Sequence, residues 1–174
     1  VNCSAGQAWG QVRATVNKHL RQFVTGGGHL FTTDWALRWP LCEVFPDYIA
    51  DDDPNTPDLM VDAHPPVGGE NHELLQNVFP LDQPYPRWQI DAQSFLVKDV
   101  GKRLEVLLAS DELAAKYAGN RMLGVTFRVG AYGGLALNVV SHFAHQGDGT
   151  PTTPMYQLIV NFLLVAKRHR ETKR

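Results

Sequence analysis

The chain has 174 residues, of which 44% are hydrophobic and 20% are charged, and its formal net charge is −2. This size and balance are those of one globular domain, and they exclude a disordered or fibrous chain. Because 16 Lys and Arg are offset by 18 Asp and Glu, the chain lacks a broad basic surface, and we expect no nucleic-acid partner. The basic cluster at the C-terminus is expected to be a solvated helix end, and it consists of Lys167, Arg168, His169, Arg170, Lys173 and Arg174.

The cysteines and the apolar runs predict a cytoplasmic protein that does not span a membrane. Cys3 and Cys42 provide neither a disulfide framework nor a metal-binding spacing, which favours reduced thiols in a cytoplasmic protein. The apolar run at residues 158–166 is interrupted by Asn161 and is too short to span a bilayer, so no membrane partner is expected. The first residues are polar or small and do not resemble a signal peptide.

The first part of the chain predicts a helix, a strand and a second helix. Residues 9–24 place apolar side chains three and four positions apart, which is typical of an amphipathic helix. The glycines at 26–28 end this helix. Residues 29–33 are rich in β-forming side chains, which predicts a short buried strand. Residues 35–44 are expected to form a helix that Pro40 kinks or divides.

The middle of the chain alternates between loops, strands and one short helix. Residues 51–57 are acidic and contain proline, which predicts a loop. Strands are expected at 58–63, 88–97 and 103–109, and a short helix at 72–78.

The last part of the chain predicts a hairpin and a closing helix. Residues 122–129 and 135–140 are expected to pair across the glycine-rich turn between them. Thr153 and Pro154 favour a helix start, because the hydroxyl can cap the helix and proline suits its first position. The buried face of this helix is expected to consist of Tyr156, Ile159, Val160, Leu163 and Leu164. Together the elements indicate a mixed, mostly parallel sheet with helices on both faces.

Three segments resemble one protein family. Residues 23–35 lead from a helix end through three glycines and a strand to Asp34. Residues 133–166 lead from a glycine-rich strand through His142 to a proline-led closing helix, and a His-Pro pair lies between the two at 64–65. In these segments the sequence resembles the ThuA-like (trehalose-utilisation) branch of the class I glutamine amidotransferase-like superfamily. The resemblance implies a three-layer, flavodoxin-like fold, with a mostly parallel central sheet and helices on both faces.

The sequence departs from the family pattern in two places. The family's first strand and helix are absent before Val1, so we expect residues 1–174 to form a single amidotransferase-like domain that lacks an N-terminal strand and helix. Upstream residues or a partner are expected to supply the missing strand. Where amidotransferases place a nucleophilic cysteine, this chain has Asp34, which cannot form the thioester that glutamine hydrolysis requires. The resemblance therefore implies a domain without glutaminase activity.

Asp34 and His142 are the candidate catalytic residues. A carboxylate at the end of a strand that opens onto a helix lies where open α/β sheets bind ligands, although Asp is also a common helix N-cap. His142 occupies the position from which the family's histidine approaches the nucleophile, and it can act as a general base near neutral pH. The alternative is a histidine held by loop hydrogen bonds. Because both residues follow strands that the resemblance places side by side, we expect them to meet at the C-terminal edge of the sheet.

The neighbours of these two residues are the expected ligand-binding positions, namely Thr33, Trp35, His145 and Gln146. His142 and His145 do not make a zinc site, because no clear third and fourth ligand accompany them. The glycine run precedes a strand and does not match a dinucleotide-binding motif, so no cofactor and no metal are expected.

Three further groupings have an ordinary explanation beside a functional one. The acidic run at 51–53 lacks the spacing of a calcium loop and is expected to be a solvated loop. A polar group could converge on a site or belong to a loop and helix start, and it consists of His64, Glu70, His72 and Glu73. An aromatic group could pack in the core or stack on a sugar, and it consists of Trp35, Trp39, Phe45 and Tyr48.

Two functions are consistent with these residues. The first is a binding or interaction module that is not a glutaminase, with a small molecule, a sugar, a protein partner or a preceding domain as its ligand. The second is a hydrolase or carbohydrate-processing enzyme that uses Asp34 and His142. A pocket that contains both side chains would favour the enzyme, and a His142 turned away from Asp34 would favour the module.

Overall fold

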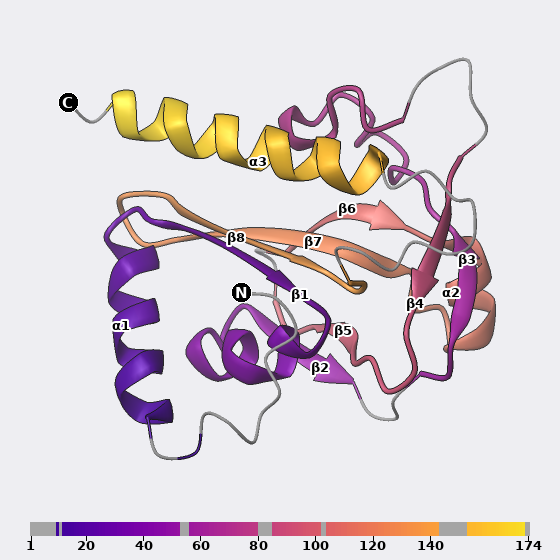
Figure 1. Ribbon diagram of the computed structural model, residues 1–174, viewed down its shortest axis with the longest axis horizontal. Coiled ribbons are helices and arrows are strands. Elements are labelled where there is room, and N and C mark those ends of the chain that lie inside the picture. The colour runs from indigo at the N-terminus through magenta and orange to yellow at the C-terminus, as the bar shows by residue number, and fades with distance from the viewer. Residues whose placement is uncertain are drawn as a thin grey trace.

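The protein is organised around one four-stranded sheet, in which the strand order is β1-β8-β7-β6 (Figure 1). These strands are β1 (His29–Thr33), β6 (Glu105–Ala109), β7 (Met122–Val129) and β8 (Gly134–Val139). The computed structural model describes residues 10, 12–52, 56–79, 85–101, 104–142 and 153–172.

Only one of the pairings in this sheet is parallel. β1 and β8 run in the same direction, and Thr33 lies opposite Val139 at their carboxyl ends. β7 is antiparallel to β8 on one side and to β6 on the other. The predicted β7–β8 hairpin is confirmed, and Gly130 and Gly133 take positive φ values of 71° and 64° in its turn, a conformation that glycine adopts without steric cost.

Two small antiparallel sheets complete the strand content of the described residues. One pairs β2 (Ile49–Asp52) with β5 (Leu96–Asp99), and the other pairs β3 (Leu59–Asp62) with β4 (Arg87–Ile90).

The longer helices lie on opposite sides of the four-stranded sheet. α1 (Arg13–Thr25) lies on one side and α3 (Thr153–Glu171) crosses the other (Figure 1). The shorter helical segments are α2 (Asp111–Lys116), the 3-10 turns η2 (Asp34–Ala36) and η4 (Glu73–Leu75), and the π-type turn η3 (Leu37–Cys42). Across the part of the chain that the structure describes, no helix combines the length and the apolar character that crossing a bilayer requires.

The expected three-layer, flavodoxin-like fold with a mostly parallel sheet is wrong. Two of the three pairings in the main sheet are antiparallel, and the remaining described strands form separate antiparallel pairs. A parallel neighbour requires a long crossover connection, whereas the glycine turn between β7 and β8 returns the chain at once and enforces an antiparallel neighbour.

Several predicted segments are shorter or divided. The strand expected at 88–97 is two strands, β4 and β5, separated by a turn at 91–95. The helix expected at 72–78 is only a 3-10 turn, and the one at 35–44 is a 3-10 turn followed by a π-type turn. The predicted helix at 9–24 appears as α1 from Arg13, and residues 1–9 and 11 lie outside the described residues.

The predicted buried face of α3 is wrong for four of its five residues, since only Ile159 of that set is partly buried and packs against the core. The side chains that pack inward are Met155, Leu158, Phe162 and Val165, and those that remain exposed include Tyr156, Val160, Leu163 and Leu164. Because α3 is apolar around most of its circumference, hydrophobic spacing alone could not choose the inward face.

Candidate functional site

The backbone places Asp34 at a sharp turn at the end of β1. Its φ is 47°, in the left-handed region that residues other than glycine seldom occupy. The N-cap position of η2 falls on Thr33, so Asp34 is not the N-cap that its sequence position also allowed. Its side chain is only 1% exposed. A buried carboxylate requires partners inside the protein.

His142 is one of these partners. Its Nε2 lies 3.2 Å from Oδ2 of Asp34. Because β1 and β8 are parallel, the segments that follow them leave the sheet at the same edge. The expectation that Asp34 and His142 meet at the carboxyl edge of these strands is therefore confirmed, although the wider fold differs from the one that motivated it.

Two residues that the sequence did not single out complete the cluster. The Ser94 hydroxyl donates a hydrogen bond to Oδ1 of Asp34, and Nδ1 of His142 contacts Oδ2 of Asp91. The other oxygen of Asp91, Oδ1, accepts a hydrogen bond of 3.0 Å from the side-chain amide of Gln89. Asp34, Asp91, Ser94 and His142 are called the strand-end network below.

The strand-end network joins all three sheets. Asp34 follows β1 and His142 lies shortly after β8, so both belong to the main sheet. Asp91 follows β4 directly, and Ser94 lies just before β5, so each belongs to a different small sheet. The Ser141 hydroxyl adds a hydrogen bond of 2.8 Å to the carbonyl oxygen of Gln89 in β4. Polar side chains at four strand ends thus meet in one cluster.

The chemistry of the strand-end network is that of a closed set of partners. Both oxygens of Asp34 contact protein groups, and both ring nitrogens of His142 face carboxylates. Buried polar groups that are fully paired specify one arrangement of the chain, whereas losing one partner exposes the other to the cost of burial.

The expected ligand-binding residues are not all available to a ligand. Thr33 is fully buried. Trp35 packs against Trp39 and Phe95, with a distance of 6.1 Å between ring centroids in each case. His145 and Gln146 lie outside the described residues.

The aromatic group divides into two clusters. Trp35 and Trp39 join Phe95, whereas Phe45 and Tyr48 pack on Phe127, with centroid distances of 5.6 and 5.1 Å. Both clusters belong to the hydrophobic core or pack against it, which supports the packing interpretation over a sugar platform.

The polar groups at 51–53 and 64–73 do not form one site. Asp51 lies in β2, not in a loop, and forms an ion pair with Arg38. His64 lies near Asp62, and His72 lies 3.6 Å from Glu105, so the two histidines have separate partners.

Asp62, His64 and Asp111 bring ligand-type atoms within 4.8 Å of one another. Asp62, however, accepts hydrogen bonds from the Ser110 hydroxyl and from the amides of Asp111 and Glu112, so it caps the start of α2. Partial burial alone would raise the pKa of Asp62, but these hydrogen bonds and the nearby His64 hold it below its usual value. Helix capping accounts for this cluster without a metal.

Cys42 is not placed for catalysis. Burial, the negative charge of Asp51 and a hydrogen bond to Asp51 raise the pKa of the Cys42 thiol far above its ordinary value, although the positive charge of Arg38 opposes the shift. The protonated thiol is a poor nucleophile.

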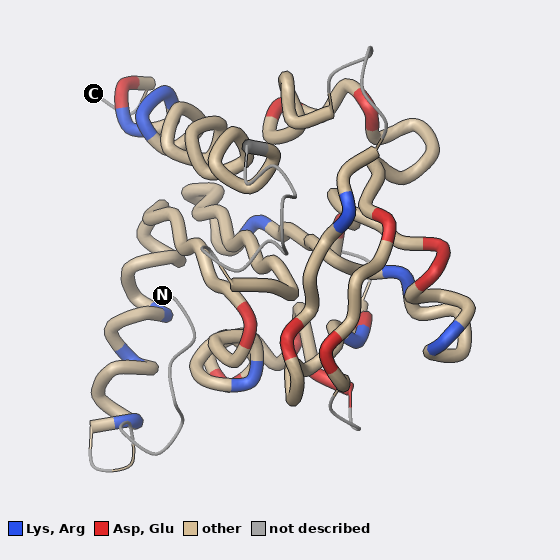
Figure 2. Tube along the Cα trace, turned by 45° about the vertical axis from the view of Figure 1, so that its right-hand side comes forward, with Lys and Arg blue, Asp and Glu red and all other residues tan. Residues whose placement is uncertain are grey.

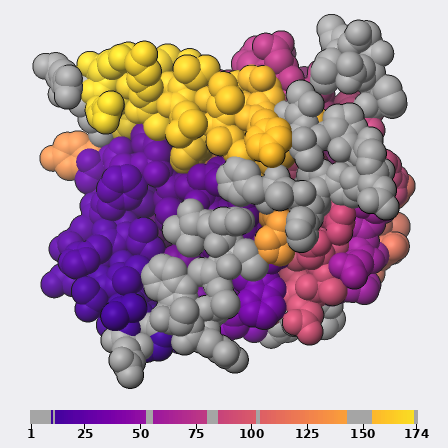
Figure 3. Space-filling view, in the orientation of Figure 1, coloured from indigo at the N-terminus to yellow at the C-terminus, as the bar shows by residue number. Residues whose placement is uncertain are grey.

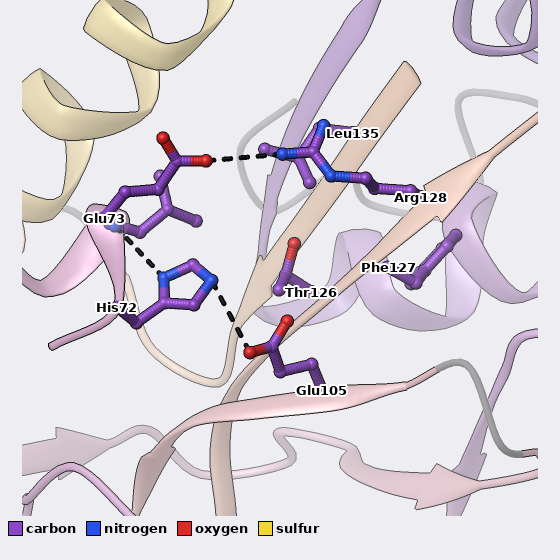
Figure 4. A pocket seen from close by; sticks show the side chains of 8 residues that line it. His72, Glu73, Glu105, Thr126, Phe127, Arg128 and Leu135 are labelled. Atoms are coloured by element: carbon purple, nitrogen blue, oxygen red, sulfur yellow. Dashed lines mark hydrogen bonds and ion pairs between the residues drawn. The ribbon is translucent and has the colours of Figure 1, made fainter. Parts of the chain in front are cut away.

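A hollow of about 270 Å³ lies between η4 and the main sheet (Figure 4). Its charged groups are paired with each other, since His72 lies 3.6 Å from Glu105 and Arg128 lies 3.3 Å from Glu73. Its lining does not include Asp34 or His142.

Sequence reasoning missed Asp91 and Ser94 because it treated 88–97 as one strand. The run Asp91-Ala92-Gln93-Ser94 is a polar, turn-forming sequence inside an otherwise apolar stretch, which was the available signal. Gln93 takes a φ of 67° in that turn.

No protein-family model and no curated protein sequence matches the chain. Its fold is similar to a ThuA-like protein from Bacteroides uniformis ATCC 8492, with a TM-score of 0.57 and 15% identity over 84% of this chain and 62% of that one. It is also similar to part of a cold-adapted β-galactosidase from Rahnella sp. R3, with a TM-score of 0.59 and 14% identity over 90% of this chain. The chain spans only 21% of the length of that β-galactosidase. The likeness to the Bacteroides protein shows a ThuA-like fold.

Proposed function

We propose that this ThuA-like domain acts as a binding or interaction module and that the strand-end network holds its three sheets together. The observation that carries the proposal is the burial of Asp34, which is 1% exposed and has protein partners on both carboxylate oxygens. A nucleophile or general base needs an atom within reach of its substrate. Asp34 offers none in this arrangement.

The likeness to part of a longer protein also supports a module. In the β-galactosidase, the matching region is about a fifth of the chain, so a similar fold is there one part of a longer protein. Because one fold hosts many functions, this likeness is support by analogy, and the site carries the argument. The ligand classes that we propose are a small molecule or sugar and a protein. The exposed apolar residues of α3 favour the protein.

The proposal is tested by assaying the purified protein with 4-nitrophenyl glycosides, 4-nitrophenyl esters and glutamine. We expect no turnover above that of the Asp34→Ala variant, whose fold is checked by circular dichroism. A turnover that falls by about a hundredfold or more in both Asp34→Ala and His142→Ala would contradict the proposal, because general acid–base groups contribute factors of that size.

The orientation of His142 favours the second candidate, a hydrolase that uses Asp34 and His142, because His142 is turned toward Asp34 and not away from it. The criterion of a shared pocket does not favour it in the hollows of about 270 and 560 Å³, since neither is lined by these two residues. His142 faces Asp34 at 3.2 Å, Asp91 holds the opposite ring nitrogen, and the His142 side chain is 23% exposed. A histidine oriented by a carboxylate is a recurrent catalytic arrangement. The same substrate assay distinguishes the two candidates.

A further inference from the structure

We propose that the outer face of α3, together with the hollow beside α1, docks an acidic amphipathic helix of a partner protein. The proposal rests on the interaction role proposed above, and it adds the surface and the chemistry of the partner. Figure 3 shows α3, in yellow and gold, as a ridge on the surface of the molecule.

The outer face of α3 is a stripe of exposed apolar side chains. Tyr156, Val160, Leu163 and Leu164 are 52%, 47%, 60% and 47% exposed. They recur at intervals of three and four residues and therefore lie on one side of the helix. Since the opposite side packs on the core, α3 is apolar on both sides, which is typical of a helix covered by protein on both sides. A clustered apolar surface of this kind marks an interaction site more often than scattered apolar residues do.

A hollow of about 560 Å³ continues this stripe toward α1. Phe23 and the glycines at 26–28 line one wall, and Leu163, Ala166 and Arg170 line the other. Leu163 belongs to both the stripe and the hollow, so the two form one surface. The Phe23 side chain is 55% exposed, and the volume accommodates a large apolar anchor side chain of a partner.

The charge at the edge of this surface favours an acidic partner. Residues 153–166 of α3 carry no charge, and its charged residues gather at the C-terminal end (Figure 2). There Lys167 pairs with Glu171 at 3.8 Å and Arg168 pairs with Glu73 at 2.9 Å. The Arg170 side chain is exposed and makes no ion pair or side-chain hydrogen bond with any other described residue. It is therefore a cation that a partner carboxylate can reach, at the edge of the apolar surface.

The same charges disfavour a second copy of this chain as the occupant. The acidic residue of α3 is Glu171, which already pairs with Lys167. A second α3 would thus bring a neutral stripe and further basic residues to Arg170. An amphipathic helix with leucines at helical spacing and glutamates beside them satisfies both the stripe and the cation.

The test is binding of a fluorescein-labelled synthetic helix with Leu at intervals of three and four and Glu elsewhere, measured by anisotropy on the full chain. We expect saturable binding that weakens at higher salt. Leu163→Asp should weaken it by about tenfold or more, and Arg170→Glu by about threefold to tenfold. The matched control is Val67→Asp, which places the same charge at a fully exposed apolar residue outside the surface and should change nothing.

Equal binding of a peptide with Lys in place of Glu, an unchanged affinity in Leu163→Asp or no binding at all would each overturn the proposal. A concentration-dependent dimer in sedimentation that Leu163→Asp dissociates would instead identify a second copy as the occupant. These results do not test the proposed function of the domain as a whole. That proposal is contradicted only by a turnover that depends on Asp34 and His142. A well-folded Arg170→Glu variant with unchanged binding would refute the charge argument.

Discussion

At the scale of single residues, the carboxylate of Asp34 is buried and both of its oxygens contact protein groups. Asp34→Ala removes the acceptor of the Ser94 hydroxyl and the carboxylate that faces Nε2 of His142, so we expect the free energy of unfolding to fall by about 1–3 kcal/mol. Asp34→Asn should cost less, because the amide keeps hydrogen-bonding capacity and Asn tolerates the left-handed backbone. Urea unfolding measures both. Equal losses in the two variants would contradict this account.

The thiols give a second prediction at this scale. Because the raised pKa of Cys42 keeps its thiol protonated, we expect slow alkylation of Cys42 by iodoacetamide at neutral pH and no release of ammonia from glutamine. The control is the same assay on the urea-unfolded chain, where alkylation should be fast. Ammonia release that disappears in Cys3→Ser or Cys42→Ser would refute the prediction.

Sequence could place Asp34 and His142 together but could not find their partners. The family-like segments put both residues at strand ends, and the parallel pairing of β1 with β8 then brings them within 3.2 Å. Asp91 and Ser94 lie in the turn between β4 and β5. Because apolar residues flank this turn on both sides, the sequence pattern predicted one continuous strand there. Their contacts with Asp34 and His142 depend on the tertiary structure, which the local sequence pattern does not predict.

At the scale of elements, Asp62 ties β3 to the start of α2 and makes stability depend on pH. Its pKa is depressed in the folded state, so its contribution is complete well above the unfolded value of about 3.9 and is lost as the pH falls through the folded value. We expect Asp62→Asn to be less stable than the wild type at pH 7 and the difference to shrink toward pH 3. Unfolding free energies at the two pH values measure this. A difference that is the same at both would contradict it.

The contact between α1 and β8 depends on a glycine. A Cβ at Gly134 would lie 1.8 Å from the carbonyl oxygen of Val24, which is backbone and cannot rotate away. We expect Gly134→Ala to lower the free energy of unfolding by about 3 kcal/mol or more, the upper end of the range for overpacked cores. Gly119→Ala is a comparison variant, because no atom lies within 4 Å of the added Cβ, so that its cost comes from the positive φ of 87° and not from packing. A smaller loss in Gly134→Ala than in Gly119→Ala would contradict the packing argument.

The error in α3 shows what hydrophobic spacing can and cannot decide. The pattern correctly predicted a helix from Thr153, but two apolar faces fit the same spacing. The polar residue Asn161 held the missing information. It is buried and donates hydrogen bonds to the carbonyls of Leu74 and Gln76, which fixes the inward side.

At the scale of the whole molecule, strand ends from three sheets meet in the strand-end network. The sequence predicted most of the strands and the hairpin, but its mostly parallel topology was wrong. Strand patterns report burial, not the direction of the neighbouring strand, and the short connections among the later strands favour antiparallel pairs. The separation of β2 with β5 and β3 with β4 into small sheets leaves the strand-end network as a shared polar junction.

The central claim, that this junction is structural, is tested most directly by a double-mutant cycle on unfolding free energy with His142→Ala and Asp91→Ala. These residues contact each other across two sheets, so we predict a coupling energy of about 0.5–3 kcal/mol. The exposed pair Lys167 and Glu171 provides the control, with an expected coupling below about 0.5 kcal/mol. Additive losses from His142→Ala and Asp91→Ala, within about 0.5 kcal/mol, would contradict the account.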